Sequence, residues 1–287
     1  MSVSVVVVTR RRRQLLAALL ASLRKQTHPC QQVLVVDHAA ERDVEDLTLA
    51  CGVDYVCAAG LSLGAARQVG VEKATGEFIA FIDDDCIPDS DWLEELTRPL
   101  LLTSKPLGVQ GMTVPEPGPI GSHAIHVTRP DGLFRTCNIA YRRSAIEAAG
   151  GFDTRFHGWF EDAALAARVL RFGPIGWQAQ ARVMHRAMPR RAVTRQRWGV
   201  LLRDERLLAT DYRTYYRRYR GPGFLVTVIA RWLLGSPAKT LWRELPRARD
   251  DAFAYARLAC LLVLERWNLL KALGDLVVED RIGHGRR

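Results

Sequence analysis

The segment EFIAFIDDD, residues 77–85, decides how the rest of this chain is interpreted. Most of its first six residues are apolar, which is typical of a β-strand buried on both faces. Asp83, Asp84 and Asp85 follow this strand directly. Since adjacent carboxylates repel one another, we expect a cation beside them, and hard divalent ions prefer oxygen ligands of this kind. The alternative is an acidic loop that caps the following helix.

Two similar strand patterns occur earlier in the chain, at residues 4–8 and 32–36, with helical patterns between them. Strands that alternate with helices predict an α/β fold with a doubly wound, mostly parallel sheet flanked by helices. Thr9 and Asp37 follow the two early strands. Because ligands bind beyond the carboxyl ends of such strands, Thr9, Asp37 and the three aspartates are expected at one rim of the sheet.

Other candidate site residues are spread along the chain. Glu161 and Asp162 begin a predicted helix, as a general base would or as ordinary helix-start charges do. His185 follows a predicted strand and is a candidate metal ligand, although a lone histidine is more often structural. Arg67 lies near a helix start, where it either meets a bound anion or lies on the surface. Arg11, in a run of four arginines, is either a phosphate ligand or solvated.

The composition is that of a globular protein, and it indicates an intracellular one. The 287 residues are 48% hydrophobic and 25% charged, which excludes a disordered chain. An uninterrupted apolar stretch long enough to span a membrane is not found. The first apolar run precedes its charges, unlike a secretory signal, and the six cysteines show no CxxC or metal-binding spacing. We therefore expect a cytoplasmic protein with reduced thiols.

The positive charge is concentrated in the last third of the chain. Residues 186–287 contain 22 Lys or Arg and 10 Asp or Glu, whereas the preceding residues contain 19 and 21. We therefore predict two domains, an α/β domain at 1–187 and a helical, basic C-terminal extension at 188–287. Anionic partners of such a region include a membrane surface, and a merely solvated basic surface is the alternative.

Apolar segments in this basic region, at 224–234 and 254–270, are too short or too charged to cross a bilayer. They either pack on the first domain or lie at a membrane interface, which would place the protein peripherally at the inner face of the membrane. The basic, tyrosine-rich segment 212–220 would then contact lipid or shape an acceptor pocket.

Six motifs in one order carry a more specific resemblance. They are VVVVTRRR, LVVD, GLSLGAARQVGVEKATGEFIAFIDDD, CNIAYRRSAIEAAGGFD, GWFEDAALAAR and MHR. Over residues 3–187 the chain strongly resembles the family 2 glycosyltransferases, which have the GT-A fold. The resemblance implies transfer of a hexosyl group from a nucleotide diphosphate donor, expected to be a UDP-sugar. It also implies inversion of configuration and assistance from Mn²⁺ or Mg²⁺.

The resemblance implies a role for each matching residue. Those implied to contact the nucleotide or its diphosphate are Thr9, Asp37, Arg67, Asp83 and Asp84. Those implied to reach the metal are Asp85, Asp83 and His185. Asp162, paired with Glu161, is implied to be the catalytic base. The acceptor hydroxyl is left open among a lipid-linked molecule, a polysaccharide and a small metabolite.

Some features depart from the family pattern, and two other functions compete with it. His38-Ala39-Ala40 replaces the usual Asn/Asp-Gly-Ser after Asp37, and Gln68 replaces the commoner Asn. A nucleotidyltransferase would need a glycine-rich loop after the first strand, which the arginine run does not supply. A basic protein that binds nucleic acid or membrane without catalysis is the other alternative. Because the chain contains no recognisable nucleic-acid module, a nucleic-acid partner is not expected.

Overall fold

The computed structural model describes residues 2–102, 106–119, 122–189, 194–228, 236–246 and 251–284. Contacts divide the chain into two compact units. Unit 1 comprises 1–116 and 124–186, and unit 2 comprises 117–123 and 187–287. The division into domains at residue 187 stays a prediction, because compactness alone does not show that a segment folds by itself.

Unit 1 contains an eight-stranded sheet with the strand order β3-β2-β1-β4-β8-β6-β9-β5. The strands are β1 (Val3–Thr9), β2 (Gln32–Asp37), β3 (Asp54–Cys57), β4 (Phe78–Phe81), β5 (Cys86–Pro88), β6 (Gly108–Pro115), β8 (Ile139–Arg142) and β9 (Ile175–His185). The helices are α1 (Arg13–Leu23), α2 (Arg42–Ala50), α3 (Leu63–Lys73), α4 (Trp92–Leu101), α5 (Arg143–Ala148) and α6 (Glu161–Val169).

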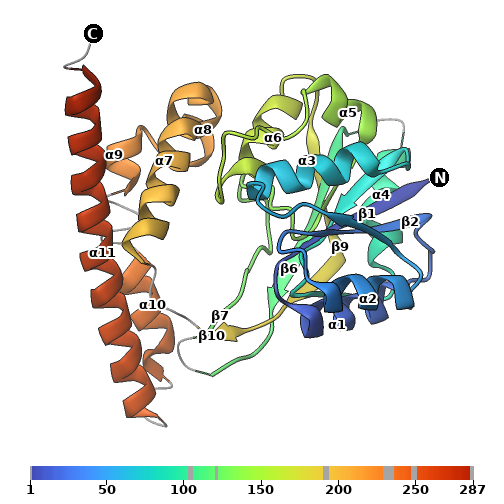
Figure 1. Ribbon diagram of the computed structural model, residues 1–287, viewed down its shortest axis with the longest axis horizontal. Coiled ribbons are helices and arrows are strands. Elements are labelled where there is room, and N and C mark those ends of the chain that lie inside the picture. Colours follow the sequence, from blue (N-terminus) through green and yellow to red (C-terminus); the bar gives the residue numbers. More distant parts are fainter. Residues whose placement is uncertain are drawn as a thin grey trace. The chain divides into compact units, whose positions relative to one another are not determined.

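Helices cover both faces of this sheet, as the doubly wound prediction requires (Figure 1). The odd-numbered valines of β1, Val3, Val5 and Val7, join the core that contains α1 and α4. Val6 points to the other face, toward α3, where a Cβ on Gly70 would lie only 2.5 Å from Val6 Cγ1. Glycine at this helical position therefore lets α3 pack closely on the sheet.

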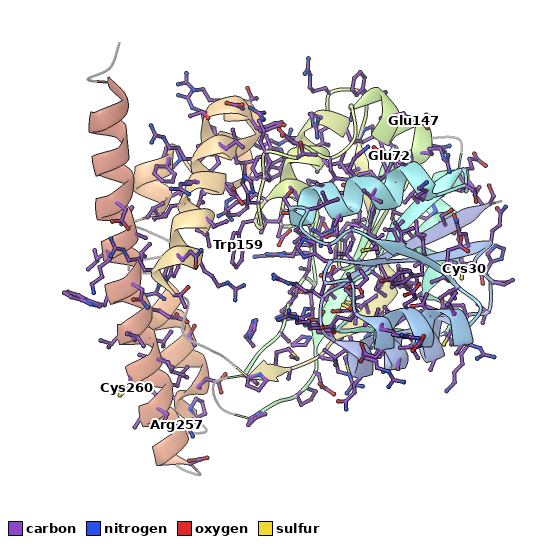
Figure 2. All side chains as sticks on the ribbon, in the orientation of Figure 1. Cys30, Glu72, Glu147, Trp159, Arg257 and Cys260 are labelled. Atoms are coloured by element: carbon purple, nitrogen blue, oxygen red, sulfur yellow. The ribbon has the colours of Figure 1, made fainter. Side chains whose placement is uncertain are left out.

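The outer side of the α3 layer is polar, in contrast to the side that covers the sheet. Figure 2 shows Glu72 of α3 and Glu147 of α5 at the outside of this layer, and both are exposed. The separation of apolar and polar sides is what an amphipathic helix needs in order to bury one side against a sheet.

The strand pairing brings the predicted rim residues together. The pairs β1–β2, β1–β4, β2–β3 and β6–β9 are parallel, whereas the pairs that β8 forms with β4 and β6, and β5 with β9, are antiparallel. Thr9 is directly opposite Asp37 at the carboxyl ends of β1 and β2. The aspartates follow β4, the other parallel neighbour of β1. The mostly parallel sheet is thus confirmed, with antiparallel strands inserted on one side.

The proline- and glycine-rich segment 113–135 contains short strand segments. Residues up to Pro115 extend β6, and Thr113 forms a bridge with Val127. Between them, the two-residue strand β7 (Ser122–His123) pairs with β10 (Met188–Pro189), and both belong to unit 2.

The other described elements of unit 2 are helices. Its helices are α7 (Arg195–Asp211), α8 (Arg213–Tyr219), α9 (Phe224–Thr227), α10 (Ser236–Glu244) and α11 (Ala252–His284). The long helix α11 packs along α7 (Figure 1). Only the first part of the apolar segment predicted at 224–234 lies within the described residues. In the part of the chain that the structure describes, every helix is too short or too polar to cross a membrane.

Candidate active site

The three aspartates lie in the turn between β4 and β5, where each has a different environment. Asp84 and Asp85 are buried, and Asp83 is the most exposed of the three side chains. Thr9 Oγ1 donates a hydrogen bond of 2.7 Å to Asp84 Oδ2. Burial raises the pKa of Asp84 to about 6, with the guanidinium of Arg12 acting in the opposite direction. The turn therefore concentrates negative charge in a partly desolvated position.

Within the arginine run 10–13, Arg12 reaches this turn. Its Nη1 lies 2.9 Å from Asp84 Oδ1 and 2.7 Å from Asp85 Oδ2. Arg11, for which a phosphate contact is predicted, forms a 3.3 Å ion pair with Glu41 and is largely exposed. Arg11 has a φ of 56°, in the left-handed region. A left-handed residue interrupts the alternation of side-chain directions that a strand has. The sequence pattern alone therefore does not tell which arginine side chain points toward the aspartates.

Arg67 connects the aspartate turn to the start of α6. Its Nη2 donates to Asp83 Oδ1 at 3.2 Å, and its Nη1 forms an ion pair with Glu161 Oε1. Arg67 and Glu161 are both buried, so Arg67 is not a surface residue. The close approach is helped by Gly64, where a Cβ would lie 3.2 Å from Glu161 Cβ. Groups that are 16 and 94 residues from Arg67 in the chain therefore meet at one guanidinium.

Asp162 lies in the first turn of α6, next to Glu161. Its Oδ1 accepts a hydrogen bond of 2.7 Å from the backbone N–H of Ala163. Burial, followed by repulsion from Glu161, raises the pKa of Asp162 to about 7. A carboxyl group with this pKa is matched to proton transfer near neutral pH. The predicted helix start at Glu161 is confirmed.

Backbone strain accompanies these residues. Phe160, directly before α6, has a φ of 65°, and Arg11, Ala40 and Phe134 are the other described non-glycine residues with positive φ. Phe160 directly precedes α6, Arg11 follows β1 by two residues, and Ala40 follows β2 by three. Phe134 directly precedes Arg135, whose charge acts on Asp162. Strained conformations of this kind are concentrated at functional sites because the surroundings must hold them in place.

Asp85 and His185 form a donor set suited to a divalent cation. Asp85 Oδ1 is buried without a hydrogen-bond partner and lies 3.5 Å from His185 Nε2. His185 Nδ1 is 3.0 Å from the carbonyl oxygen of Arg186. A hydrogen bond there fixes the ring so that Nε2 is available as a ligand. The thiol of Cys86 lies within 4.8 Å of the Asp85 and His185 donor atoms.

Asp37 is held rigidly at the end of β2. Its two carboxylate oxygens accept hydrogen bonds from the backbone N–H groups of Ala39 and Glu41, at 2.8 and 2.6 Å. The hydroxyl of Tyr55 donates to Asp37 Oδ2 at 3.1 Å. These contacts order the segment that replaces the usual family sequence, and they orient the carboxylate at the rim beside Thr9.

Acidic side chains outnumber basic side chains at this site. Five carboxyl groups, those of the aspartate turn and of the Glu161-Asp162 pair, lie with two arginines, Arg12 and Arg67. With all of them ionised and His185 neutral, three negative charges remain uncompensated. A divalent cation would offset this repulsion, whereas a phosphorylated ligand alone would increase it.

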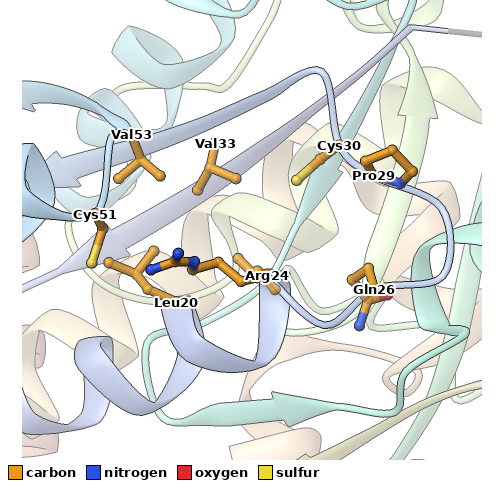
Figure 3. A pocket seen from close by; sticks show the side chains of 9 residues that line it. Leu20, Arg24, Gln26, Pro29, Cys30, Val33, Cys51 and Val53 are labelled. Atoms are coloured by element: carbon orange, nitrogen blue, oxygen red, sulfur yellow. The ribbon is translucent and has the colours of Figure 1, made fainter.

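A separate cavity of about 210 Å³ lies at the opposite end of β2 (Figure 3). It is lined by Leu20, Leu23, Arg24, Gln26, Pro29, Cys30, Val33, Cys51 and Val53. Val33 is the second residue of β2 and Asp37 is the last, so the cavity and the rim are separated by roughly the length of a five-residue strand segment, about 15 Å. Its volume is below that of most small-molecule sites, and it contains none of the predicted residues.

Sequence reasoning missed Arg12 and Cys86 as members of this site. Cys86 carries a local signal, since it follows Asp85 directly, but a buried cysteine is more often a packing residue. The burial of Arg67 has no local signal, because its partners are distant in sequence. The roles predicted for the individual residues stay predictions. The structure links the predicted residues to one another through strand pairing, hydrogen bonds and ion pairs; they are Thr9, Asp37, Arg67, the three aspartates, His185 and the Glu161-Asp162 pair.

Comparisons with known proteins agree with this arrangement. A family model described as glycosyl transferase family 2 matches residues 4–148, just over half of the chain. The succinoglycan biosynthesis protein ExoM of Rhizobium meliloti is 28% identical over 189 residues, which cover 55% of this chain and 59% of that protein. A glucosyl-dolichyl phosphate glucuronosyltransferase of Haloferax volcanii is 27% identical over 164 residues, or 46% and 49% of the two chains. The chain thus spans about half to three-fifths of the length of these relatives.

Solved structures with the same fold extend over more of the chain. The mannosyltransferase PcManGT from Pyrobaculum calidifontis, in complex with GDP-Man and Mn²⁺, has a TM-score of 0.60 and 17% identity, covering 95% of this chain and 87% of its own. Residues 1–349 of S. aureus TarS, in complex with UDP-GlcNAc, give 0.61 and 15%, with coverages of 94% and 89%. At these identities the likeness shows the fold alone, and it confirms the predicted GT-A architecture.

Proposed function

The chain belongs to glycosyl transferase family 2, and from this premise we propose that it transfers a hexosyl group from a nucleotide diphosphate donor to a hydroxyl acceptor with inversion. The observation that carries the proposal is the position of Arg67, which contacts both Asp83 and Glu161. Through this one side chain, the group of carboxylates suited to the donor lies next to the group suited to the acceptor.

We assign the donor to the rim formed by β1, β2 and the aspartate turn. Thr9 and Asp37 lie opposite each other there, in the position where parallel α/β sheets bind ligands. A UDP-sugar is the donor that we propose, since TarS has been solved with UDP-GlcNAc. A GDP-sugar is the alternative donor, since PcManGT has been solved with GDP-Man. We propose Arg11, which follows β1 by two residues, as a further phosphate contact.

The residues present fit a divalent metal ion. Asp85 Oδ1 and His185 Nε2 are the proposed ligands, with Asp83 as a further one, and the orphaned buried oxygen of Asp85 supports this assignment. When bound, Mn²⁺ or Mg²⁺ would stabilise the negative charge on the leaving diphosphate. Arg12 holds Asp84 and Asp85 in position through its two ion pairs.

Asp162 is the proposed general base. The acceptor hydroxyl attacks the anomeric carbon on the face opposite the leaving diphosphate, and its proton passes to Asp162 Oδ2, because Oδ1 already accepts the N–H of Ala163. Glu161 is neutralised by Arg67, which leaves Asp162 as the carboxylate free for this transfer. Attack from that side inverts the configuration. The names of the two relatives, both from glycan assembly, favour a saccharide hydroxyl on a lipid or polysaccharide over a small metabolite.

The proposal is tested by release of nucleoside diphosphate from UDP- and GDP-sugars in the presence of Mn²⁺, with water or a saccharide as acceptor. We expect Asp162→Asn to lower the rate by roughly 10²–10⁴-fold while calorimetric binding of UDP is retained. Asp43→Asn, at an exposed position of α2, is the matched control and should behave as the unsubstituted protein. Normal turnover by Asp162→Asn would refute the base assignment, and failure of all these donors to bind would refute the proposed function.

A further inference from the structure

Helix α11 has apolar side chains on two opposite sides. One side, formed by Leu258, Leu262, Leu269 and Ala272, is buried, and α11 packs against α7. The other side contains Cys260, Val263, Leu264, Trp267 and Leu270, all of them exposed. Apart from the adjacent pair Val263 and Leu264, these residues follow one another at intervals of three or four, so they lie along one broad face of the helix. We call this set the outer face of α11.

The outer face is unusual for a helix in contact with water. Its large side chains are 47–71% exposed, with Val263 at 71% and Trp267 at 58%. Figure 2 shows Cys260 on the side of α11 away from α7. A helix that is apolar on all sides is normally buried on all sides. Contiguous exposed apolar surface of this kind marks a site of interaction with a protein or a membrane.

The adjacent helix α10 adds exposed apolar groups to unit 2. Trp242 is 77% exposed, and Leu245, directly after the helix, is 47% exposed. Helices α10 and α11 are in contact with each other. The exposed tryptophans are notable, because tryptophan is enriched where proteins meet the interface between lipid and water.

The charges that unit 2 exposes are more basic than its composition indicates. Four of its acidic side chains, Asp204, Glu205, Glu244 and Glu265, are at most 5% exposed. Among the described residues, the exposed basic ones are Arg195, Arg197, Arg203, Arg213, Arg217, Arg218, Arg257 and Lys271. Asp211 and Asp251 are the exposed acids among the described residues of unit 2, so its exposed bases outnumber its exposed acids and its surface attracts anions.

Lys271 is exposed and directly follows Leu270, the last residue of the outer face. Its Nζ lies 4.9 Å from the centre of the Trp267 ring, so an ammonium group and an indole share one end of this face. A lysine of this kind keeps its charge at the level of the lipid headgroups while its methylene groups and the neighbouring ring contact the apolar region.

We propose that the outer face of α11 docks onto an anionic lipid bilayer. Exposed apolar side chains supply the inserted surface, and the exposed basic residues of unit 2 supply attraction to anionic headgroups. The same excess of positive charge opposes pairing of two copies of this chain through the same face, which is why we assign the face to lipid. The helix would lie in the interface without crossing it, since no described helix is suited to span a membrane.

Vesicle flotation of the full chain without nucleotide tests this proposal independently of catalysis. Two vesicle compositions are compared, phosphatidylcholine alone and phosphatidylcholine with phosphatidylglycerol, each at low and high salt. We expect flotation with the anionic vesicles, weakened at high salt because the attraction is screened. The double variant Leu264→Gln/Trp267→Gln should lower vesicle affinity at least about tenfold. Leu49→Gln, at a 63% exposed position of α2, is the matched control and should float unchanged.

Circular dichroism establishes that each variant keeps its helices, and Lys271→Gln provides a second variant that leaves the apolar side chains in place. Lys271→Gln should weaken binding to anionic vesicles at low salt, by a factor of a few, with less effect at high salt. Absence of flotation with anionic vesicles would overturn the proposal, and so would equal flotation of the double variant. Sedimentation equilibrium that shows a dimer abolished by the double variant would assign the face to a second copy instead.

Discussion

Replacement of Asp162 by Asn should stabilise the protein, by an amount that grows with pH. In the folded protein, burial raises the pKa of Asp162 to about 7, whereas an unfolded chain has an aspartate pKa of about 3.9. As the pH rises from 4 to 7, the unfolded chain therefore releases this proton before the folded protein does. Release favours the unfolded state, so Asp162 lowers the free energy of unfolding over this interval and no further above pH 7.

The magnitude follows from the difference of about three pKa units. Each unit corresponds to about 1.4 kcal/mol. Because Asp162 is only partly buried, solvent screening reduces the total to about half, about 2 kcal/mol at pH 8. About one third of this effect, about 0.7 kcal/mol, is already present at pH 5. The Asn side chain still offers an oxygen to the N–H of Ala163, so the helix start is preserved.

Calorimetric melting at pH 5 and pH 8 measures both values. At pH 8 the variant should melt about 4–8 °C above the unsubstituted protein, and at pH 5 the difference should fall to about one third. Asp43→Asn, exposed on α2, controls for the general effect of removing a carboxylate. A variant that is less stable at pH 8 than the unsubstituted protein, or a difference that is the same at both pH values, would refute the environment that we describe for Asp162.

Three further predictions concern other parts of the site and fold. Because the base must be ionised, the rate of nucleotide release at limiting donor should fall about tenfold per pH unit below pH 7 and level off above it. A pH–rate profile measures this, and a flat profile from pH 5 to 8 would contradict it. Arg67→Met should lower the free energy of unfolding, measured by urea denaturation, by about 3–5 kcal/mol, since it leaves buried Glu161 unpaired. An unchanged midpoint of urea denaturation would show that the ion pair between Arg67 and Glu161 is not formed. Gly70→Ala should lower the melting temperature, reflecting about 1–3 kcal/mol of overpacking against Val6, and an increase would show that α3 lies farther from β1.

The parts of the fold that the sequence predicts are those with local patterns. The valine run of β1 and the apolar run of β4 each indicate a strand buried on both faces, and the structure confirms both. The insertion of β8 between β4 and β6 has no such signal, because Ile139–Arg142 is short and the order of strands depends on contacts between distant segments.

The same distinction holds for the site. The position of Asp83, Asp84 and Asp85 at a strand end follows from the sequence, because the carboxyl end of a parallel strand is a fixed place. The inward turn of Arg12 depends on the left-handed backbone at Arg11, and tertiary contacts decide that conformation. Local sequence therefore predicts where polar groups leave the sheet, but it does not predict which cations they meet.

We propose that carboxylates from distant parts of the chain gather around a nucleotide held by a cation. Anomalous diffraction from crystals grown with UDP and Mn²⁺ tests it most directly. The account predicts a manganese peak in contact with Asp85 and His185 and with the diphosphate, and Asp162 on the side where the sugar would be attached. A manganese ion and nucleotide bound elsewhere, with Asp85 and His185 touching neither, would contradict it.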